Sequence, residues 1–274
     1  DRKFWEERGL KKFRFSRKIL GIPYAAFLFV FVAAPLAVLF YYAFTDGNGN
    51  PTFSNLVGFF ANANTLGTLF YSFAVALVTT AVCLLIAYPT AYILANSRLK
   101  NRSALLLLFI MPMWINFSLR ITALKEILTV IEGNLSFYPF LNAVVGMSYD
   151  FLPFMILPIY NTLSKLDGSL VEAARDLGAD GKSAFLRVVL PLSVPGIISG
   201  VSMVFLPAMT NYVVLDMLYN STYIMGSLIG SYFAAYNWNG GSMIALILLG
   251  IICLFTFLTG RGGEDTRKVG GALL

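Results

Sequence analysis

Long uncharged runs alternate with short charged segments along this chain. No Asp, Glu, Lys or Arg occurs within residues 19–45, 47–97, 188–215 or 217–260. A helix needs about 20 mostly apolar residues to cross a bilayer. The pattern therefore predicts an all-α membrane protein with six transmembrane helices. Their expected ranges are 19–44, 66–95, 103–121, 138–163, 192–214 and 240–260.

Two features qualify the first and fourth of these spans. Asp150 interrupts the fourth span, and Pro153 and Pro158 are expected to kink it. The first run is too long for the apolar region of a signal peptide and has no persuasive small-residue cleavage site. We therefore expect it to be a retained helix.

The composition supports the same class of protein. Hydrophobic residues make up 58% of the chain and charged residues 12%, whereas soluble domains average about half and about a quarter. There is no His, and both cysteines, Cys83 and Cys253, fall inside apolar runs, where buried thiols are expected. No nucleophile–base pair or metal-ligand spacing is visible. We expect no enzyme activity, no metal site and no cofactor bound by this chain.

The positive charges lie on one side of the predicted spans. Of the 20 Lys and Arg residues, 18 occur in residues 1–18, 96–102, 164–191 and 261–274. Loops 45–65 and 215–239 contain none. Because cytoplasmic loops are enriched in Lys and Arg, both termini are expected in the cytoplasm. No basic aromatic platform stands apart from the membrane flanks, so nucleic-acid binding is not predicted.

This orientation divides the chain into three parts. Residues 1–18 form a basic cytoplasmic tail, either an amphipathic helix on the inner membrane surface or an ordinary positive flank. Residues 19–260 form the transmembrane domain, with a cytoplasmic loop at 164–191. Residues 261–274 form a second cytoplasmic tail.

The 164–191 loop contains signals for a short helix. Ser169 and Glu172 fit a capping box at its start, and Gly178 fits the stop after its end. Its apolar positions share one face, at Leu170, Ala173, Ala174 and Leu177. Such a helix suits docking into a groove on a soluble partner. The alternative is a loop that only joins two spans.

The same loop contains part of a phosphate-binding pattern. The segment GADGKS ends like G-x-x-x-x-G-K-[ST], but Asp176 stands where the first Gly is needed. We therefore expect that this chain does not bind ATP, and that another subunit supplies any ATP hydrolysis.

The loop also resembles the EAA motif of bacterial ABC importer permeases, EAA-x3-G-x9-I-x-LP. Its matching residues are Glu172, Ala173, Ala174, Gly178, Val188 in place of Ile, Leu190 and Pro191. In that family the loop forms a coupling helix that sits in a cleft of the ATPase. The resemblance implies ATPase-coupling roles for Glu172, Ala173, Ala174, Leu177 and Gly178. It also implies that ATP and Mg are bound by the partner ATPase.

Three further stretches resemble the spermidine/putrescine permeases within this class. They are MPMWINFSLRITALKEIL from 111, LPFMILPIYNTLSKLD from 152, and LPAMTNYVVLDML from 206. This resemblance implies a multi-pass protein of the bacterial cell membrane. Its implied partners are an ATPase dimer, a second homologous permease and an extracellular solute-binding protein. The alternatives are a permease for another small solute and an ATP-independent secondary transporter, although no internal repeat supports the latter.

A polyamine path needs carboxylates, carbonyls and aromatic faces. The first candidates are Asp216 and Asp150, because an acid within an apolar segment is costly. Further path candidates are Trp114, Tyr149, Asn211 and Tyr212; the alternative for these is interfacial anchoring, packing or helix–helix hydrogen bonding. Arg120 would repel a polycation, so we expect it to pair with Glu126, Glu132 or helix-end carbonyls.

Pro207 is expected to bend the fifth span, because proline removes a backbone hydrogen bond. We therefore name Leu206, Pro207 and Met209 as candidate gate residues, with a plain kink as the alternative. Gly196 and Gly200 form a GxxxG pair that permits close helix contact. Residues 217–239 could include a short helix on the outer face.

Overall fold

The computed structural model describes residues 21–96, 102–219 and 224–271. The predicted tail 1–18 lies outside this range. Among the described residues every regular element is a helix, apart from an isolated β-bridge between Thr45 and Pro51. The all-α prediction is confirmed.

The helices follow one another with short connections. The first half contains α2 (Gly21–Leu28), the π-helical turn η1 (Phe29–Ala33), α3 (Ala34–Ala43), α4 (Ser54–Ala61), α5 (Ala63–Asn96), α6 (Arg102–Ile110), the 3-10 turn η2 (Met111–Trp114) and α7 (Phe117–Glu132). The second half contains η3 (Leu135–Phe137), α8 (Pro139–Leu163), α9 (Gly168–Asp176), α10 (Gly181–Ala184), the π-helical turn η4 (Phe185–Val189), α11 (Leu190–Thr210), α12 (Tyr212–Tyr219), α13 (Met225–Ala234) and α14 (Trp238–Gly271).

Five continuous helical segments are long and apolar enough to cross a membrane. They are Pro23–Ala43, Ala63–Asn96, Pro139–Leu163, Gly181–Thr210 and Trp238–Thr259. These correspond to the first, second, fourth, fifth and sixth predicted spans. The fifth differs in its bounds, since it begins at Gly181 instead of 192 and ends at Thr210. The charged loop therefore runs directly into a membrane helix.

The third predicted span is not one straight helix. Segments Ala104–Trp114 and Phe117–Glu132 meet at an angle of 95°. The break follows from local chemistry: Pro112 lacks a backbone N–H, and the side chain of Asn116 accepts a hydrogen bond from Ser118 N–H and begins α7. Counting this bent pair as one span gives six.

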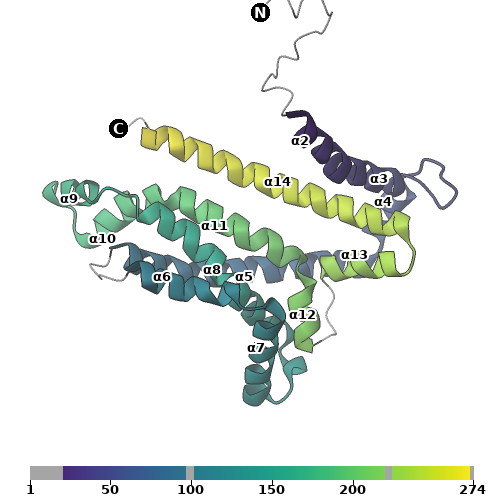
Figure 1. Ribbon diagram of the computed structural model, residues 1–274, viewed down its shortest axis with the longest axis horizontal. Coiled ribbons are helices and arrows are strands. Elements are labelled where there is room, and N and C mark those ends of the chain that lie inside the picture. Colours follow the sequence, from purple (N-terminus) through teal and green to yellow (C-terminus); the bar gives the residue numbers. More distant parts are fainter. Residues whose placement is uncertain (1–20, 97–101, 220–223, 272–274) are drawn as a thin grey trace, which may run out of the picture.

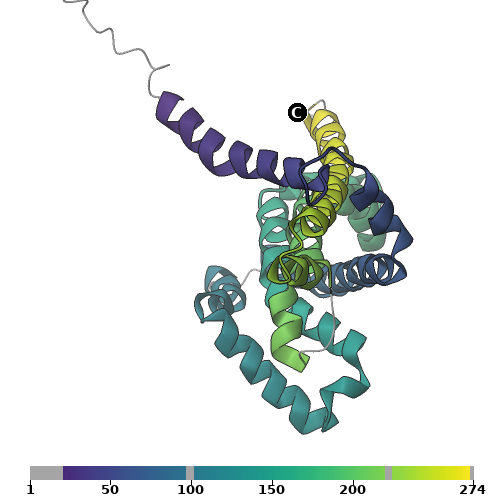
Figure 2. The ribbon, with the colours of Figure 1, turned by 90° about the vertical axis from the view of Figure 1, so that its right-hand side faces the viewer.

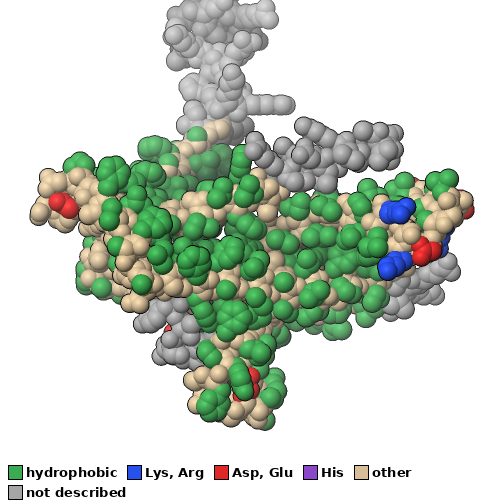
Figure 3. Space-filling view, turned by 180° about the vertical axis from the view of Figure 1, so that it is seen from behind, with side chains coloured by type: hydrophobic (Ala, Val, Ile, Leu, Met, Phe, Trp, Pro, Cys, Tyr) green, Lys and Arg blue, Asp and Glu red, His purple; other side chains and the backbone are tan. Residues whose placement is uncertain are grey.

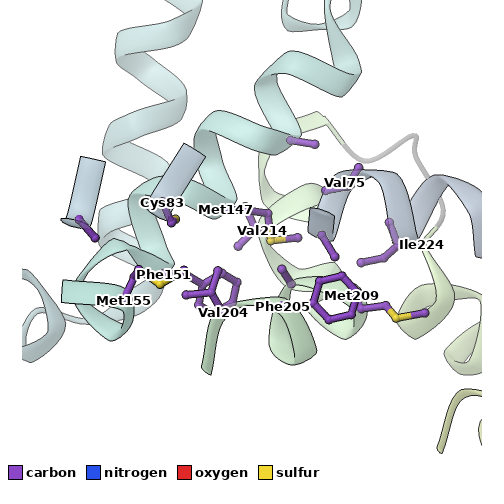
Figure 4. Close-up of a cluster of buried hydrophobic side chains, with 14 of the residues drawn as sticks. Val75, Cys83, Met147, Phe151, Met155, Val204, Phe205, Met209, Val214 and Ile224 are labelled. Atoms are coloured by element: carbon purple, nitrogen blue, oxygen red, sulfur yellow. The ribbon is translucent and has the colours of Figure 1, made fainter. Parts of the chain in front are cut away.

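Helices α5, α8 and α11 pack together as the core of the molecule. Two α11 glycines allow the close approach of α8. A Cβ atom at Gly196 would lie 2.5 Å from Thr162 Oγ1, and one at Gly200 would lie 2.6 Å from Met155 Sδ. The close contact expected from the GxxxG pair is confirmed. Figure 4 shows side chains from α5, α8, α11 and α12 meeting in this buried cluster.

The other helices surround this core unevenly. Helix α14 packs against α3, α11 and α13, and α7 and α12 project from the side of the molecule (Figures 1 and 2). The most apolar stretch of the first span contains no buried residue, and Figure 2 shows α2 splayed away from the other helices. Figure 3 shows charged side chains at the end that carries α9 and α10 and at two further tips, with a largely hydrophobic face between them.

Candidate functional site

Helix α9 stands at one end of the molecule, beside α10 (Figure 1). Its N-cap is Asp167, whose Oδ1 accepts a hydrogen bond of 3.0 Å from Ser169 N–H. The expected capping box with Ser169 as N-cap is therefore wrong. The N-cap lies two residues earlier, where the Asp167 carboxylate accepts the hydrogen bond from Ser169 N–H at the start of the helix. These hydrogen bonds lower the pKa of Asp167. The acid is thus a stable cap at neutral pH.

The end of α9 is as predicted, at Gly178. This residue has φ +86°, a conformation that side-chain-bearing residues rarely adopt. Gly178 N–H donates to Arg175 O at 2.9 Å, and Ala179 N–H donates to Ala174 O at 3.0 Å. This pair of bonds is a Schellman motif. The positive φ of residue 178 therefore explains why this position of the EAA-like pattern is a glycine.

The apolar face of α9 is open to its surroundings. Leu177 is 90% exposed and Leu170 is 43% exposed. Glu172 and Ala173 are also exposed, while Ala174 is half-buried. A short helix that is capped at both ends and shows apolar side chains can dock into a complementary groove. The coupling roles inferred for these residues remain predictions.

The candidate path residues lie on several neighbouring elements. Asp216 and Tyr212 are one turn apart on α12 and both are exposed. Tyr149 of α8 is 40% exposed and Trp114 of η2 is 75% exposed. Helix α12 packs against α7 and α8, so Asp216 and Tyr149 belong to adjacent elements. Asn211 also has a local contact, since its Oδ1 accepts a hydrogen bond from Val213 N–H at the start of α12, and its path role remains a prediction.

Asp150 is not a free acid in this structure. Its Oδ1 lies 2.8 Å from Arg120 Nη2, and both side chains are buried. The expected partners of Arg120 are therefore wrong: Glu126 is exposed, and Glu132 accepts a hydrogen bond from Asn142 Nδ2 at 2.8 Å. Residue spacing does not predict Asp150 as this partner, because the pairing depends on how α7 packs against α8.

The surroundings of Arg120 show a second contact with α8. Its guanidinium carbon lies 6.0 Å from the centre of the Tyr149 ring, within range of a cation–π interaction. Its Nε and Nη1 are buried and have no hydrogen-bond partner among the described residues. The ion pair therefore ties α7 to α8, and the path role predicted for Asp150 stays untested.

The candidate gate residues lie in α11, which continues through Pro207 to Thr210. Met209 is fully buried in the core (Figure 4), and Leu206 and Pro207 are half-buried. Thr210 Oγ1 lies 3.4 Å from Leu206 O and 3.2 Å from Pro207 O, and donates toward both. In this conformation Met209 packs the core, and a gating role remains a prediction.

Solved structures share this fold. The MetNI methionine ABC transporter in its inward-facing conformation matches with a TM-score of 0.57 at 19% identity, over 73% of this chain and 95% of that chain. A bacterial ABC transporter for import of the acidic polysaccharide alginate matches with a TM-score of 0.64 at 16% identity, over 89% and 94%. The chain thus shares its fold with chains of two ABC transporters.

The sequence comparison narrows the class. Residues 13–261 match the family model described as the binding-protein-dependent transport system inner membrane component, and the chain belongs to this family. The spermidine/putrescine transport system permease protein PotB of Haemophilus influenzae is 38% identical over 209 residues, which are 70% of this chain and 73% of the relative. PotB of Escherichia coli is 35% identical over 217 residues, 73% and 78% of the two chains. The chain is a multi-pass permease of an ABC importer.

Proposed function

We propose that this permease imports polyamines of the spermidine/putrescine class across a bacterial cell membrane. The observation that carries the proposal is 38% identity to PotB over most of both chains. The exposed acid and aromatic side chains of α8, α12 and η2 supply suitable chemistry, since ammonium groups bind carboxylates and aromatic faces.

The proposed orientation places α9 and both termini in the cytoplasm. The excess of Lys and Arg on that side supports this assignment. Helix α9 then faces a cytoplasmic ATPase dimer, into which its exposed Leu170 and Leu177 dock. ATP and Mg are bound by that ATPase. A second homologous permease completes the path, and an extracellular binding protein delivers the polyamine.

The proposed mechanism is alternating access. ATP binding closes the ATPase dimer and moves α9, and the two permeases open outward; hydrolysis returns them to the inward-open state. This cycle runs only because ATP binds the closed dimer better than the open one. The permease contributes no chemistry of its own: it transmits movement and lines half of the path.

Uptake of labelled spermidine by the reconstituted complex tests the path assignment. Asp216→Asn removes the carboxylate that is proposed to bind an ammonium group of spermidine. A hydrogen bond to a charged group contributes about 1.5–3 kcal/mol. The KM for spermidine should therefore rise about tenfold to a hundredfold. Glu126→Gln, at an exposed acid on α7, is the matched control and should leave uptake unchanged.

Three results would contradict different parts of the proposal. Unchanged uptake by Asp216→Asn removes this residue from the path. Uptake that unlabelled spermidine and putrescine fail to inhibit, while another small solute inhibits it, overturns the polyamine assignment. Uptake that persists without the ATPase subunit would instead indicate a secondary transporter.

A further inference from the structure

Both π-helical turns among the described residues directly precede an X-Pro step. In η1, Ala34 N–H bonds to Phe29 O before Pro35, and in η4, Leu190 N–H bonds to Phe185 O before Pro191. Proline has no N–H, and its ring clashes with the carbonyl four residues earlier. A π-turn is a rare single-turn bulge within an α-helix. In η4 this wide turn lies where the loop enters α11, directly before Pro191.

The η4 turn is fastened to α5 at its first residue. The Phe185 ring lies edge-on to two α5 tyrosines, with centroid distances of 5.9 Å to Tyr88 and 5.2 Å to Tyr92. The interplanar angles are 82° and 85°, the edge-to-face arrangement that aromatic pairs favour. We call Tyr88, Tyr92 and Phe185 the aromatic cluster.

Tyr88 also holds the other end of the turn. Ser193 Oγ donates to Leu190 O at 2.8 Å, which uses its one proton. The Tyr88 hydroxyl, 3.0 Å from Ser193 Oγ, must therefore be the donor of their hydrogen bond. Ser193 is fully buried. One side chain of α5 thus contacts both η4 and the start of α11, through its ring on Phe185 and its hydroxyl on Ser193.

These contacts connect α9 to the core. Helices α9 and α10 pack on η4, and η4 continues into α11. A π-turn on its own is a weak point where a helix bends. The contacts of Phe185 and Tyr88 brace this turn against α5 and so oppose such bending.

From these contacts we propose that Phe185 and Tyr88 are positioning residues that convert movement of α9 into joint movement of α5 and α11. This inference rests on the proposed function, because it assumes that the ATPase moves α9. The inference goes beyond the proposed function, because it names residues outside the α9 docking face that set how much solute is transported per ATP hydrolysed.

The test measures ATP hydrolysis and solute uptake together in proteoliposomes that contain the complete transporter. With Phe185→Ala, the ATPase should copurify as in the parent and hydrolysis should continue. The amount of solute taken up per ATP should fall about threefold to thirtyfold, the range for mutations that alter coupling between sites. Phe185→Tyr keeps the ring edges and should restore the parental ratio.

Three further variants make the comparison specific. Leu186→Ala changes the neighbouring residue of the same turn, which is 47% exposed, and should keep the parental ratio. Tyr88→Phe keeps the ring but removes the hydroxyl, so it should lower the ratio less than Phe185→Ala. Phe185→Leu keeps most of the buried volume without the ring, and it should lower the ratio even if the Ala variant fails to fold.

Failure of the inference differs from failure of the proposed function. A parental ratio of uptake to ATP in Phe185→Leu, or an equal fall in Leu186→Ala, overturns the role of the aromatic cluster. Loss of the ATPase from the Phe185 variants also overturns it, because the effect would then be on docking. Retention of the ATPase by a variant with Leu177→Asp would count against the proposed function instead.

Discussion

Gly178 is the residue whose backbone explains its identity most directly. Its φ of +86° closes the Schellman motif that ends α9, and no atom lies within 4 Å of a Cβ built there. Gly178→Ala should therefore destabilise this end of the helix by about 1–2 kcal/mol through backbone strain alone. Hydrogen exchange of the α9 amides measures this effect.

Gly181 provides the matched control for this prediction. It also has open space around a Cβ atom, but its φ is not in the left-handed region. Gly181→Ala should leave α9 exchange unchanged. Equal protection of α9 in both variants would show that the conformation of Gly178 is not what ends the helix.

The Arg120–Asp150 pair leads to a prediction about a buried charge. Removing one partner leaves the other charge uncompensated, which costs about 3–5 kcal/mol. Asp150→Asn or Arg120→Met should lower the thermal unfolding midpoint of the purified complex. The double exchange Arg120→Asp with Asp150→Arg should recover much of the loss.

Transport by the double exchange separates two roles of Asp150. If the acid only braces α7 against α8, uptake returns with stability. If its carboxylate also contacts the solute, stability returns and uptake does not. Equal stability of the parent and both single variants would contradict the brace itself.

At the scale of elements, the packing of α8 against α11 depends on two small residues. A Cβ atom at Gly196 would lie 2.9 Å from the Pro158 carbonyl oxygen, which is backbone and cannot easily move. Gly196→Ala should therefore destabilise the complex by about 1–3 kcal/mol through overpacking. The thermal unfolding midpoint measures this change. Gly230→Ala on α13, which meets nothing within 4 Å, should be neutral, and an equal loss there would contradict the account.

Periodicity and charge predicted most elements but not the bends between them. Four of the five continuous spans follow from uncharged runs and the other, Pro139–Leu163, from a run that only Asp150 interrupts, because bilayer thickness fixes the length of a span. The third span is present only as a bent pair, because Pro112 and Asn116 break the helix, and a count of apolar residues does not register a change of direction. The α9 cap was misplaced by two residues because Asp167 and Ser169 can both cap a helix.

The candidate site could be predicted only in part from the sequence, because residue spacing reports local structure and not the packing between elements. Gly178 and the apolar face of α9 are local features, so spacing was sufficient to find them. The Arg120–Asp150 pair and the contact of Phe185 with Tyr88 join residues far apart in the chain. Such contacts depend on how α5, α7, α8 and η4 pack, and no local pattern specifies them.

At the scale of the whole molecule, most exposed charges lie at the end with α9 and α10 and at projecting segments such as α7, while Arg120 and Asp150 form a buried pair. The end with α9 and α10 carries both acids and bases (Figure 3), and the sequence places 18 of 20 Lys and Arg residues on that predicted side. This arrangement fits a permease that presents a polar end to the cytoplasm and an apolar body to lipid.

We propose that a separate ATPase drives this permease through the exposed face of α9. Copurification in mild detergent tests it most directly, with Leu177→Asp compared with the parent complex. Leu177 is 90% exposed, so the change should leave the fold of the chain intact. We expect the Leu177→Asp complex to lose the ATPase and to retain the second permease. Recovery of the ATPase in the parental amount would contradict it.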